Sequence, residues 1–269
     1  MTVRREYVDG RWGQVHLRIA IGPADRPPLL MLHPTPKSGW IYEPLFAPLV
    51  QGRTVIAPDT PGYGASDAPP EPASIEDFAG EMLAMMSQLA ADGRMPSGPF
   101  DVMGYHTGSV TSVALAHLAP TAVRRLVLVS LAAYSAEVRA AKRAGLVNWP
   151  GPREDGSHLA GLWTLMQGLF DRRIPTEWKH ASLVENLRSG GRAHWGYDAV
   201  YRYDLQTALD TLAHPTLILN PEDDLWVPTR ENTGRVTGAR YVELPDLKHG
   251  LFELQTARIA GLIDGFLCD

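Results

Sequence analysis

Residues 100–109, FDVMGYHTGS, join a short apolar run to the start of a helical pattern. The first six residues are typical of a buried strand, and the helical pattern continues to about residue 119. Gly104 and Gly108 flank the junction, where glycine allows close approaches and backbone angles that other residues resist. The stretch therefore predicts a sharp turn from strand to helix with His106 at its centre.

Strand and helix patterns alternate on both sides of this turn. Before it we expect two strands joined by a turn at Asp9-Gly10, then a strand, a helix, a further strand and a helix that opens at Ser74. After it we expect three more strands. The strands are predicted at residues 3–8, 12–21, 28–32, 54–57, 100–105, 123–130, 215–220 and 240–244, and the first helix at 40–50. Such alternation with short connections predicts a mostly parallel sheet with helices on both faces.

The helix that opens at Ser74 has a clear start signal. Ser74 and Asp77 have the spacing of a capping box, with Asp in place of Glu. Its apolar residues recur at helical spacing and include Met82, Met85 and Met86. We expect these methionines to fill the core.

Residues 131–204 break the alternation because they contain no convincing strand. Four of the seven tryptophans fall here: Trp149, Trp163, Trp178 and Trp195. No linker or internal repeat marks a separate unit, so we expect a helical cap inserted into a core made of residues 1–130 and 205–269. Two interpretations of the cap aromatics stay open, namely internal packing of the cap and lining of an apolar pocket.

Composition excludes several classes of protein. The 269 residues include 25 Lys and Arg against 30 Asp and Glu, and a net charge of −5 argues against a nucleic-acid partner. The single cysteine, Cys268, excludes an internal disulfide and a multi-cysteine zinc site. No apolar run reaches about 18 residues, so we expect no membrane span. No apolar run follows the first residues, so we expect no signal peptide and a cytoplasmic protein.

The order of the polar motifs along the chain is informative. The turn at His106 comes first, Asp224 follows the strand that ends at residue 220, and His249 follows the strand that ends at residue 244. Residues 33–36 (HPTP) and 59–66 (DTPGYGAS) each follow an early strand. This order resembles that of the α/β-hydrolase superfamily. It is most similar to the capped branch of epoxide hydrolases, haloalkane dehalogenases, lactonases and carbon–carbon bond hydrolases, over essentially the whole chain outside the cap.

The resemblance implies an α/β-hydrolase fold and a role for each motif. His249 would be the general acid/base, and Asp224 would accept a hydrogen bond from it and orient it. Backbone N–H groups of Thr35 and Thr107 would form an oxyanion hole, which survives although Pro34 stands where the family usually has Gly. His106 occupies the position that usually carries a nucleophilic Ser, Asp or Cys.

A histidine at this position changes the chemistry. Its ordinary pKa of about 6.5 allows a neutral ring at pH 7, and the helix N-terminus below it disfavours the protonated form. We expect His106 to act either as a base toward water or substrate, or as a nucleophile. It cannot form the alkyl-ester intermediate of an elbow Asp or the acyl-enzyme of an elbow Ser. His106 and His249 would face each other and titrate together.

The remaining polar residues near these motifs are assigned structural roles. Glu222 and Asp223 are expected to be solvated loop charges. Ser66, Ser109 and Ser130 are expected to be turn, helix and strand-end residues, and His33 a structural part of its loop. No cofactor and no metal are expected, because Asp224 would sit behind His249 and the three groups would line up rather than converge. The candidate substrate contacts in the cap are His158, His180, His194, Tyr197 and Tyr201.

Three functions are compatible with this sequence. The first is a cofactor-free hydrolase of a small, partly apolar carbonyl compound: an ester, a lactone or a carbon–carbon bond beside a ketone. The second is a lyase, an isomerase or a cofactor-independent oxygenase that uses His106 and His249 as acid and base. The third is a non-catalytic binder of small molecules, against which the retained Asp224, His249 and elbow glycines argue.

Overall fold

The computed structural model describes residues 2–148 and 151–269. Its framework is an eight-stranded sheet in the order β1-β2-β4-β3-β5-β6-β7-β8. β1 and β2 are antiparallel to their neighbours, and β3 to β8 run parallel, which confirms the predicted mostly parallel sheet. The strands are β1 (Arg4–Gly10), β2 (Gly13–Ala20), β3 (Leu29–Leu32), β4 (Val55–Pro58), β5 (Phe100–Tyr105), β6 (Val123–Val129), β7 (Thr216–Pro221) and β8 (Arg240–Leu244).

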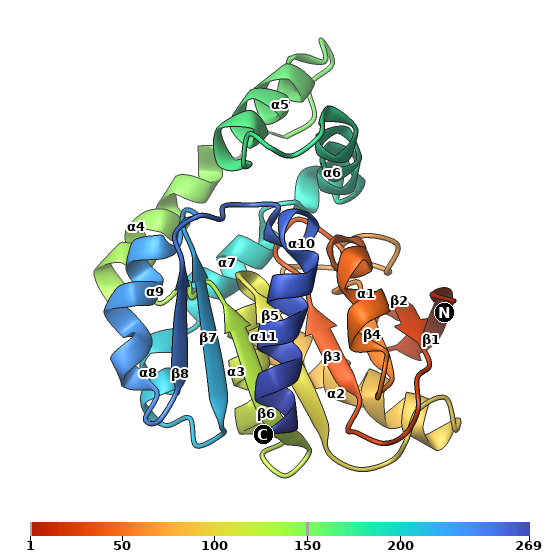
Figure 1. Cartoon of the computed structure of the whole chain (residues 1–269). Helices are drawn as coiled ribbons and strands as arrows, with labels where there is room; N and C mark the ends of the chain where they lie inside the picture. Colours follow the sequence, from red (N-terminus) through yellow and green to blue (C-terminus); the bar gives the residue numbers. More distant parts are fainter. Residues whose placement is uncertain (1, 149–150) are drawn as a thin grey trace.

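Helices cover both faces of the sheet because its central strands are apolar on both sides. In β3, Leu29 and Met31 face one core and Leu30 and Leu32 face the other. The first core is closed by α1 (Glu43–Leu49) and α11 (Thr256–Cys268), and Figure 1 shows α11 in front of the sheet. The second core is closed by α2 (Ile75–Ala91), α3 (Thr107–Leu118) and α8 (Leu205–Asp210).

Helix α2 begins as its sequence predicts. The Ser74 hydroxyl accepts a hydrogen bond from the Asp77 N–H at 3.0 Å, and the Asp77 carboxylate accepts one from the Ser74 N–H at 3.1 Å. Both halves of the capping box are therefore present. Met82, Met85 and Met86 are buried in the core, so their assignment as core residues is confirmed.

The first hairpin turns two residues later than predicted. Gly10 pairs with Gly13 as the last pair of the ladder, and the turn is made by Arg11 and Trp12. The expected turn at Asp9-Gly10 is therefore wrong. Gly10 serves a close approach instead, because a Cβ atom there would lie 1.9 Å from the Glu81 carboxylate.

The described part of residues 131–204 contains helices and no strand, and the division into core and cap stays a prediction. The helices are α4 (Ala136–Gly145), η2 (Leu146–Asn148), α5 (Ser157–Leu169), α6 (Thr176–Arg188), η3 (Gly190–Arg192) and α7 (Trp195–Arg202). Figure 1 shows α5 and α6 standing away from the sheet, above the ends of its strands. Trp149 lies outside the described residues. The remaining elements are η1 (Gly39–Tyr42), α9 (Trp226–Asn232), η4 (Thr233–Arg235) and α10 (Leu251–Leu254).

A buried ion pair ties the sheet to α11. Arg53 has no exposed side-chain surface and donates to Asp101 and to Asp264, at 3.0 Å each. Asp101 is equally buried and also accepts two hydrogen bonds from Arg124. Asp101 therefore balances part of the charge of two arginines.

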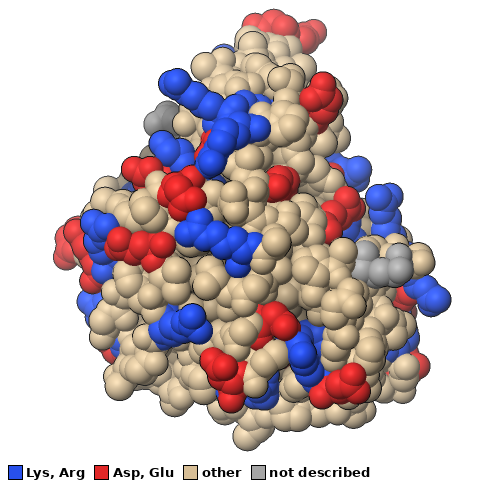
Figure 2. Space-filling view, in the orientation of Figure 1, with Lys and Arg blue, Asp and Glu red and all other residues tan. Residues whose placement is uncertain are grey.

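The surface mixes charges of both signs. In Figure 2, Lys and Arg side chains are interspersed with Asp and Glu rather than gathered into one basic face. Several of them pair across the surface, as Arg258 does with Asp246 at 2.7 Å. None of the described helices combines the length and the apolar character that a membrane crossing requires.

Candidate active site

The turn between β5 and α3 holds His106 in an unusual backbone conformation. Its φ is 52° and its ψ is −114°, one of two positive φ values among the non-glycine residues described. A Cβ atom on Gly104 would lie 2.2 Å from the Gly108 carbonyl, and one on Gly108 would lie 1.8 Å from the Leu32 carbonyl. The two glycines therefore serve close backbone approach, and the strain of the turn falls on His106, as is common at functional sites.

Asp223 is the acidic partner of His106. The His106 Nε2 atom lies 2.9 Å from Asp223 Oδ2, and the Asp223 side chain is fully buried. The same carboxylate accepts hydrogen bonds from the Ser130 hydroxyl at 2.6 Å and from the Leu225 N–H at 2.8 Å. The expectation that Asp223 is a solvated loop charge is therefore wrong, and Ser130 is more than a strand-end residue.

This pairing fixes the tautomer of a neutral His106. An ionised carboxylate only accepts hydrogen bonds, so His106 Nε2 must carry the proton that faces Asp223. The Nδ1 atom then has the free lone pair. It lies on the other side of the ring from Asp223, and His106 lines the cavity described below.

His249 belongs to a second pair. Its Nε2 atom lies 2.7 Å from Asp224 Oδ1, so the predicted pairing of these two residues is confirmed. Its Nδ1 atom lies 3.1 Å from the Tyr105 hydroxyl, which also lies 3.5 Å from Asp223. Both ring nitrogens of His249 are therefore engaged. The rings of His106 and His249 face each other with centroids 5.2 Å apart.

The predicted oxyanion donors lie beside the turn. The Thr35 N–H points toward the Thr107 hydroxyl at 3.4 Å, and both residues are buried. Thr107 is the first residue of α3, and no acceptor for its N–H is found in the described part of the chain. The Tyr197 hydroxyl donates to the Thr35 carbonyl at 2.8 Å, so α7 holds this loop. Their role as an oxyanion hole stays a prediction.

Comparison with known proteins identifies the architecture. A model of the "alpha/beta hydrolase fold" matches residues 27–154. The enol-lactonase of Burkholderia xenovorans LB400 superposes with a TM-score of 0.77 at 22% identity, covering 98% of this chain and all of that one. The chain has the α/β-hydrolase fold.

Sequence similarity to curated proteins varies in extent. A haloalkane dehalogenase of Mycolicibacterium paratuberculosis is 41% identical over 59 residues, which are 22% of this chain and 19% of that protein. A poly(3-hydroxyalkanoate) depolymerase of Ectopseudomonas oleovorans is 28% identical over 206 residues, 75% of this chain and 69% of that one. The chain spans about a fifth to a third of the length of the first curated relatives it matches.

The electrostatics of this site favour charged side chains on the two His–Asp pairs. Burial opposes charge on His106, but the charge and hydrogen bond of Asp223 outweigh it and raise the pKa of His106 above 6.5. The helix N-terminus therefore does not set this pKa, contrary to expectation. Burial likewise opposes charge on both carboxyl groups, yet the two histidines lower the pKa of Asp223 and of Asp224. Burial raises the pKa of Tyr105 well above its usual range.

The two pairs converge on one point. One ligand atom from each of His106, Asp223, Asp224 and His249 can be chosen such that all four lie within 4.8 Å of one another. The expectation that these groups line up is therefore wrong. Two imidazoles and two carboxylates are a donor set that holds a divalent transition metal. A metal would have to replace the protons of the His106–Asp223 and His249–Asp224 hydrogen bonds.

A small cavity of about 110 Å³ opens beside these residues. It is largely apolar and lies between the site and helices α5, α6 and α7. Its lining includes Ile41, Leu162, Leu165, Met166, Leu169, Phe170, Trp178, Tyr197, His106, His249, Asp224 and Lys37. Trp178 also packs against Trp40, so it serves both interpretations of the cap aromatics.

Of the candidate cap contacts, only Tyr197 lines this cavity. His158 lines a neighbouring cavity of about 220 Å³, which shares Pro36, Leu162 and Asn186 with the first. His180, His194 and Tyr201 line neither of these two cavities among the residues described.

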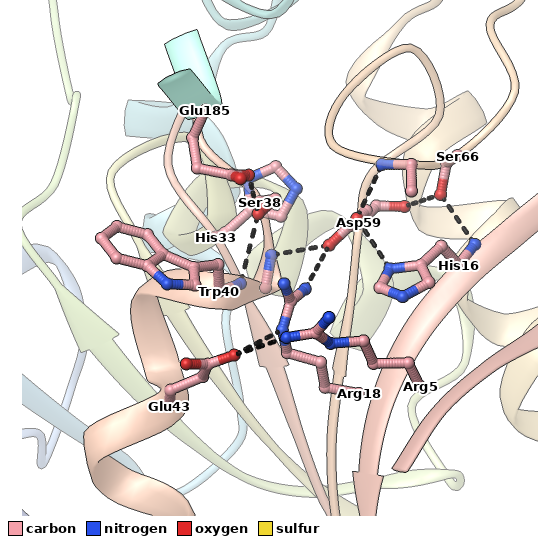
Figure 3. A network of polar contacts seen from close by, with 12 residues as sticks. Arg5, His16, Arg18, His33, Ser38, Trp40, Glu43, Asp59, Ser66 and Glu185 are labelled. Carbon is pink, nitrogen blue, oxygen red and sulfur yellow. Dashed lines mark hydrogen bonds and ion pairs between the residues drawn. The ribbon is translucent and has the colours of Figure 1, made fainter. Parts of the chain in front are cut away.

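His33 and Asp59 hold the loops around the site, as expected for His33. The His33 ring donates to the Pro34 carbonyl at 3.0 Å and accepts from the Thr60 N–H at 2.8 Å. Asp59 accepts from the Gly39 N–H and from the ring of His16, at 2.8 Å each (Figure 3). Burial lowers the pKa of His33, so this ring is neutral and structural.

Sequence reasoning missed Tyr105 and undervalued Asp223. Tyr105 stands in the turn motif itself, next to His106, but strand periodicity marks it only as a core residue. Asp223 adjoins Asp224, and the spacing to Pro228 singles out Asp224 alone. One signal in the sequence could have indicated this pairing. Two adjacent acids, Asp223 and Asp224, follow one strand, and two histidines, His106 and His249, were expected to face each other.

Proposed function

We propose that this protein is a hydrolase that acts on a small, partly apolar carbonyl compound, an ester or a lactone, with His106 as the base that activates water. One observation carries the proposal: Asp223 engages Nε2 of His106, which leaves Nδ1 as the free ring nitrogen of the two facing histidines. A buried carboxylate, an oriented imidazole and a cavity are the parts that general-base catalysis needs.

The reaction follows from these parts. A water molecule beside Nδ1 attacks the carbonyl carbon and gives its proton to His106. The carbonyl oxygen becomes an oxyanion, and the N–H groups of Thr35 and Thr107 stabilise it. The bond to the leaving oxygen then breaks, and that oxygen takes the proton back from His106 Nδ1. Asp223 stabilises the imidazolium that exists between the two transfers.

His249 and Asp224 supply a second proton path. The Tyr105 hydroxyl carries one proton and has two acceptors in reach, His249 Nδ1 at 3.1 Å and Asp223 Oδ2 at 3.5 Å. When this hydroxyl turns to Asp223, His249 Nδ1 becomes free to accept a proton. His249 therefore keeps its assigned part as acid and base, with Asp224 orienting the ring.

The similar proteins agree with acyl chemistry. An enol-lactonase and a poly(3-hydroxyalkanoate) depolymerase are both among them, and their names describe reactions at carbonyl groups. The dehalogenase similarity is confined to 59 residues. An imidazole at the turn cannot form the alkyl ester of an elbow Asp, so dehalogenation by that route is disfavoured.

The same base supports a second candidate, a lyase or isomerase. Proton abstraction next to a carbonyl needs a base and an oxyanion hole and no covalent intermediate, and His106 stands where a nucleophilic Ser, Asp or Cys is usual. Turnover in ¹⁸O-labelled water distinguishes the two, because only hydrolysis places labelled oxygen in the product.

A screen of aryl esters, lactones and β-diketones tests the proposal. We expect turnover by the wild type, a loss of at least about a hundredfold in His106→Ala, and an acidic limb of the pH profile with a midpoint above 6.5, because the base must be neutral. Binding without turnover by the wild type would favour a non-catalytic binder. A mass adduct on His106 would make it a nucleophile instead of a base.

A further inference from the structure

Lys37 carries a buried amine in the wall of the catalytic cavity. It follows the Thr35 loop, only 8% of it is exposed, and it lines the cavity together with His106 and His249. Its Nζ atom donates to the carbonyl oxygen of Ser182 at 2.9 Å and to the Ser182 hydroxyl. Both acceptors are neutral.

No carboxylate of the described chain forms an ion pair with Lys37. Glu185 is the acid whose charge acts most on it, but that carboxylate accepts a hydrogen bond from Ser38 and pairs with Arg188 at 3.1 Å. Figure 3 shows Glu185 directed at Ser38. Burial raises the pKa of Glu253, the other nearby acid, to about 7, so it carries only part of a negative charge at neutral pH.

An ammonium group in such a place is costly without an anion. Burial lowers the pKa of Lys37 to about 7, and the charges of Glu185 and Glu253 offset only part of that effect. Buried charges in proteins are usually paired. A ligand that brings a carboxylate into the cavity supplies the missing partner and forms a charge-assisted hydrogen bond.

Phe170 is close to both Lys37 and the catalytic residue His249. The Lys37 Nζ atom lies 5.6 Å from the centroid of the Phe170 ring, and the His249 ring lies 6.2 Å from the same centroid. Lys37 and His249 therefore both lie near one aromatic ring. A ligand that reaches from the histidines to Lys37 passes along an apolar surface.

We propose that Lys37 binds a carboxylate of the substrate, so that the substrate is a carboxylic acid whose reactive carbonyl is separated from the carboxylate by a short apolar spacer lying on Phe170. This inference rests on the proposed function, because it names the substrate class of the same cavity. Lys37 then determines specificity by direct contact with the substrate, and the proton chemistry stays with His106.

Calorimetric titration with 5-oxohexanoate and with its uncharged amide tests the proposal without requiring turnover. We expect the wild type to bind the acid at least about tenfold more tightly than the amide. Lys37→Met should abolish that preference and leave the affinity for the amide unchanged. Lys179→Met is the matched control, since Lys179 is similarly buried and bonds to the neutral Gln167 at 3.0 Å outside the cavity. It should retain the preference.

Several results would overturn the proposal. One is equal affinity of the wild type for acid and amide, and another is a preference that persists in Lys37→Met. A borohydride-trapped adduct on Lys37 would show an amine nucleophile instead of an anion site. If circular dichroism shows that Lys37→Met does not fold, Lys37→Gln, which keeps a donor for Ser182, takes its place. A wild type that prefers the acid but hydrolyses no ester supports the carboxylate site and refutes the proposed function.

Discussion

Replacing Asp223 or Asp224 by asparagine, one at a time, distinguishes the catalytic roles of the two His–Asp pairs. In Asp223→Asn the amide has little freedom to choose its orientation. The Leu225 N–H can only donate, and it faces Oδ1 at 2.8 Å, so the amide oxygen must occupy that side. The amide NH₂ then faces His106 Nε2. Nε2 must now accept, and the ring proton moves to Nδ1, where the mechanism needs a lone pair.

The magnitude follows from the bonds that change. The hydrogen bond at Nε2 is kept but its partner loses its charge; since a hydrogen bond to a charged group is worth about 1.5–3 kcal/mol, this change costs up to roughly 150-fold in rate. Moving the ring proton sets the upper limit, because the amide variant with the wrong tautomer lowers kcat by about 10⁴ in a Ser-His-Asp triad. We therefore expect kcat/KM of Asp223→Asn to fall by about 10² to 10⁴. Removing the charge of Asp223 also lowers the pKa of His106, so the acidic limb of the residual activity moves to lower pH.

Asp224→Asn is the matched comparison. Asp224 has a half-exposed side chain and bonds to His249 alone, so its amide can turn its oxygen toward Nε2 and keep that bond. Its kcat/KM should fall by no more than about tenfold. The assay is the steady-state hydrolysis of the best ester from the screen, with thermal melting of each variant as the folding control. A large loss in Asp224→Asn with little change in Asp223→Asn would refute the assignment of the base to the His106–Asp223 pair.

Three further outcomes test the fold and the site. Gly108→Ala should lose most activity and melt at a lower temperature, because its Cβ atom would lie 1.8 Å from the Leu32 carbonyl; wild-type melting would contradict the close approach. Arg53→Met should lower the free energy of unfolding in urea by about 1–3 kcal/mol, because Asp101 loses one buried partner and keeps only Arg124, at 2.8 Å; no measurable change would argue against the buried pair. Turnover should survive EDTA, because the site donors are already engaged in His–Asp hydrogen bonds; loss on chelation with recovery on adding Zn²⁺ would establish a metal site at the same four residues.

Local sequence signals predicted the framework closely. β5 and β8 have the predicted bounds, and the capping box at Ser74 and Asp77 is present in full. These features depend on residues that are close in the chain, so periodicity and capping preferences suffice to predict them. The prediction of the hairpin turn was wrong because Gly10 serves a close contact with Glu81, which is 71 residues away in the sequence.

The pairing of the site residues was beyond local reasoning. Asp223 and Asp224 are adjacent, yet one is fully buried under Ser130 and His106 while the other is half exposed beside His249. Their burial depends on how β6, β7 and the turn after β5 meet at the edge of the sheet. The same holds for Lys37, because its lack of a charged partner depends on where α6 places Ser182 and Glu185.

The sequence by itself determined the sheet, the turn with its two glycines, and the order of His106, Asp224 and His249 along the chain. Strand and helix periodicity, turn glycines and motif order can all be recognised from residues that are close together in the chain or from their order along it. Only the tertiary structure decided which acid serves which histidine, which ring nitrogen stays free and which cation lacks a partner. These depend on distances of about 3 Å between residues 25 to 145 positions apart, where a small rotation of a side chain makes or breaks a hydrogen bond.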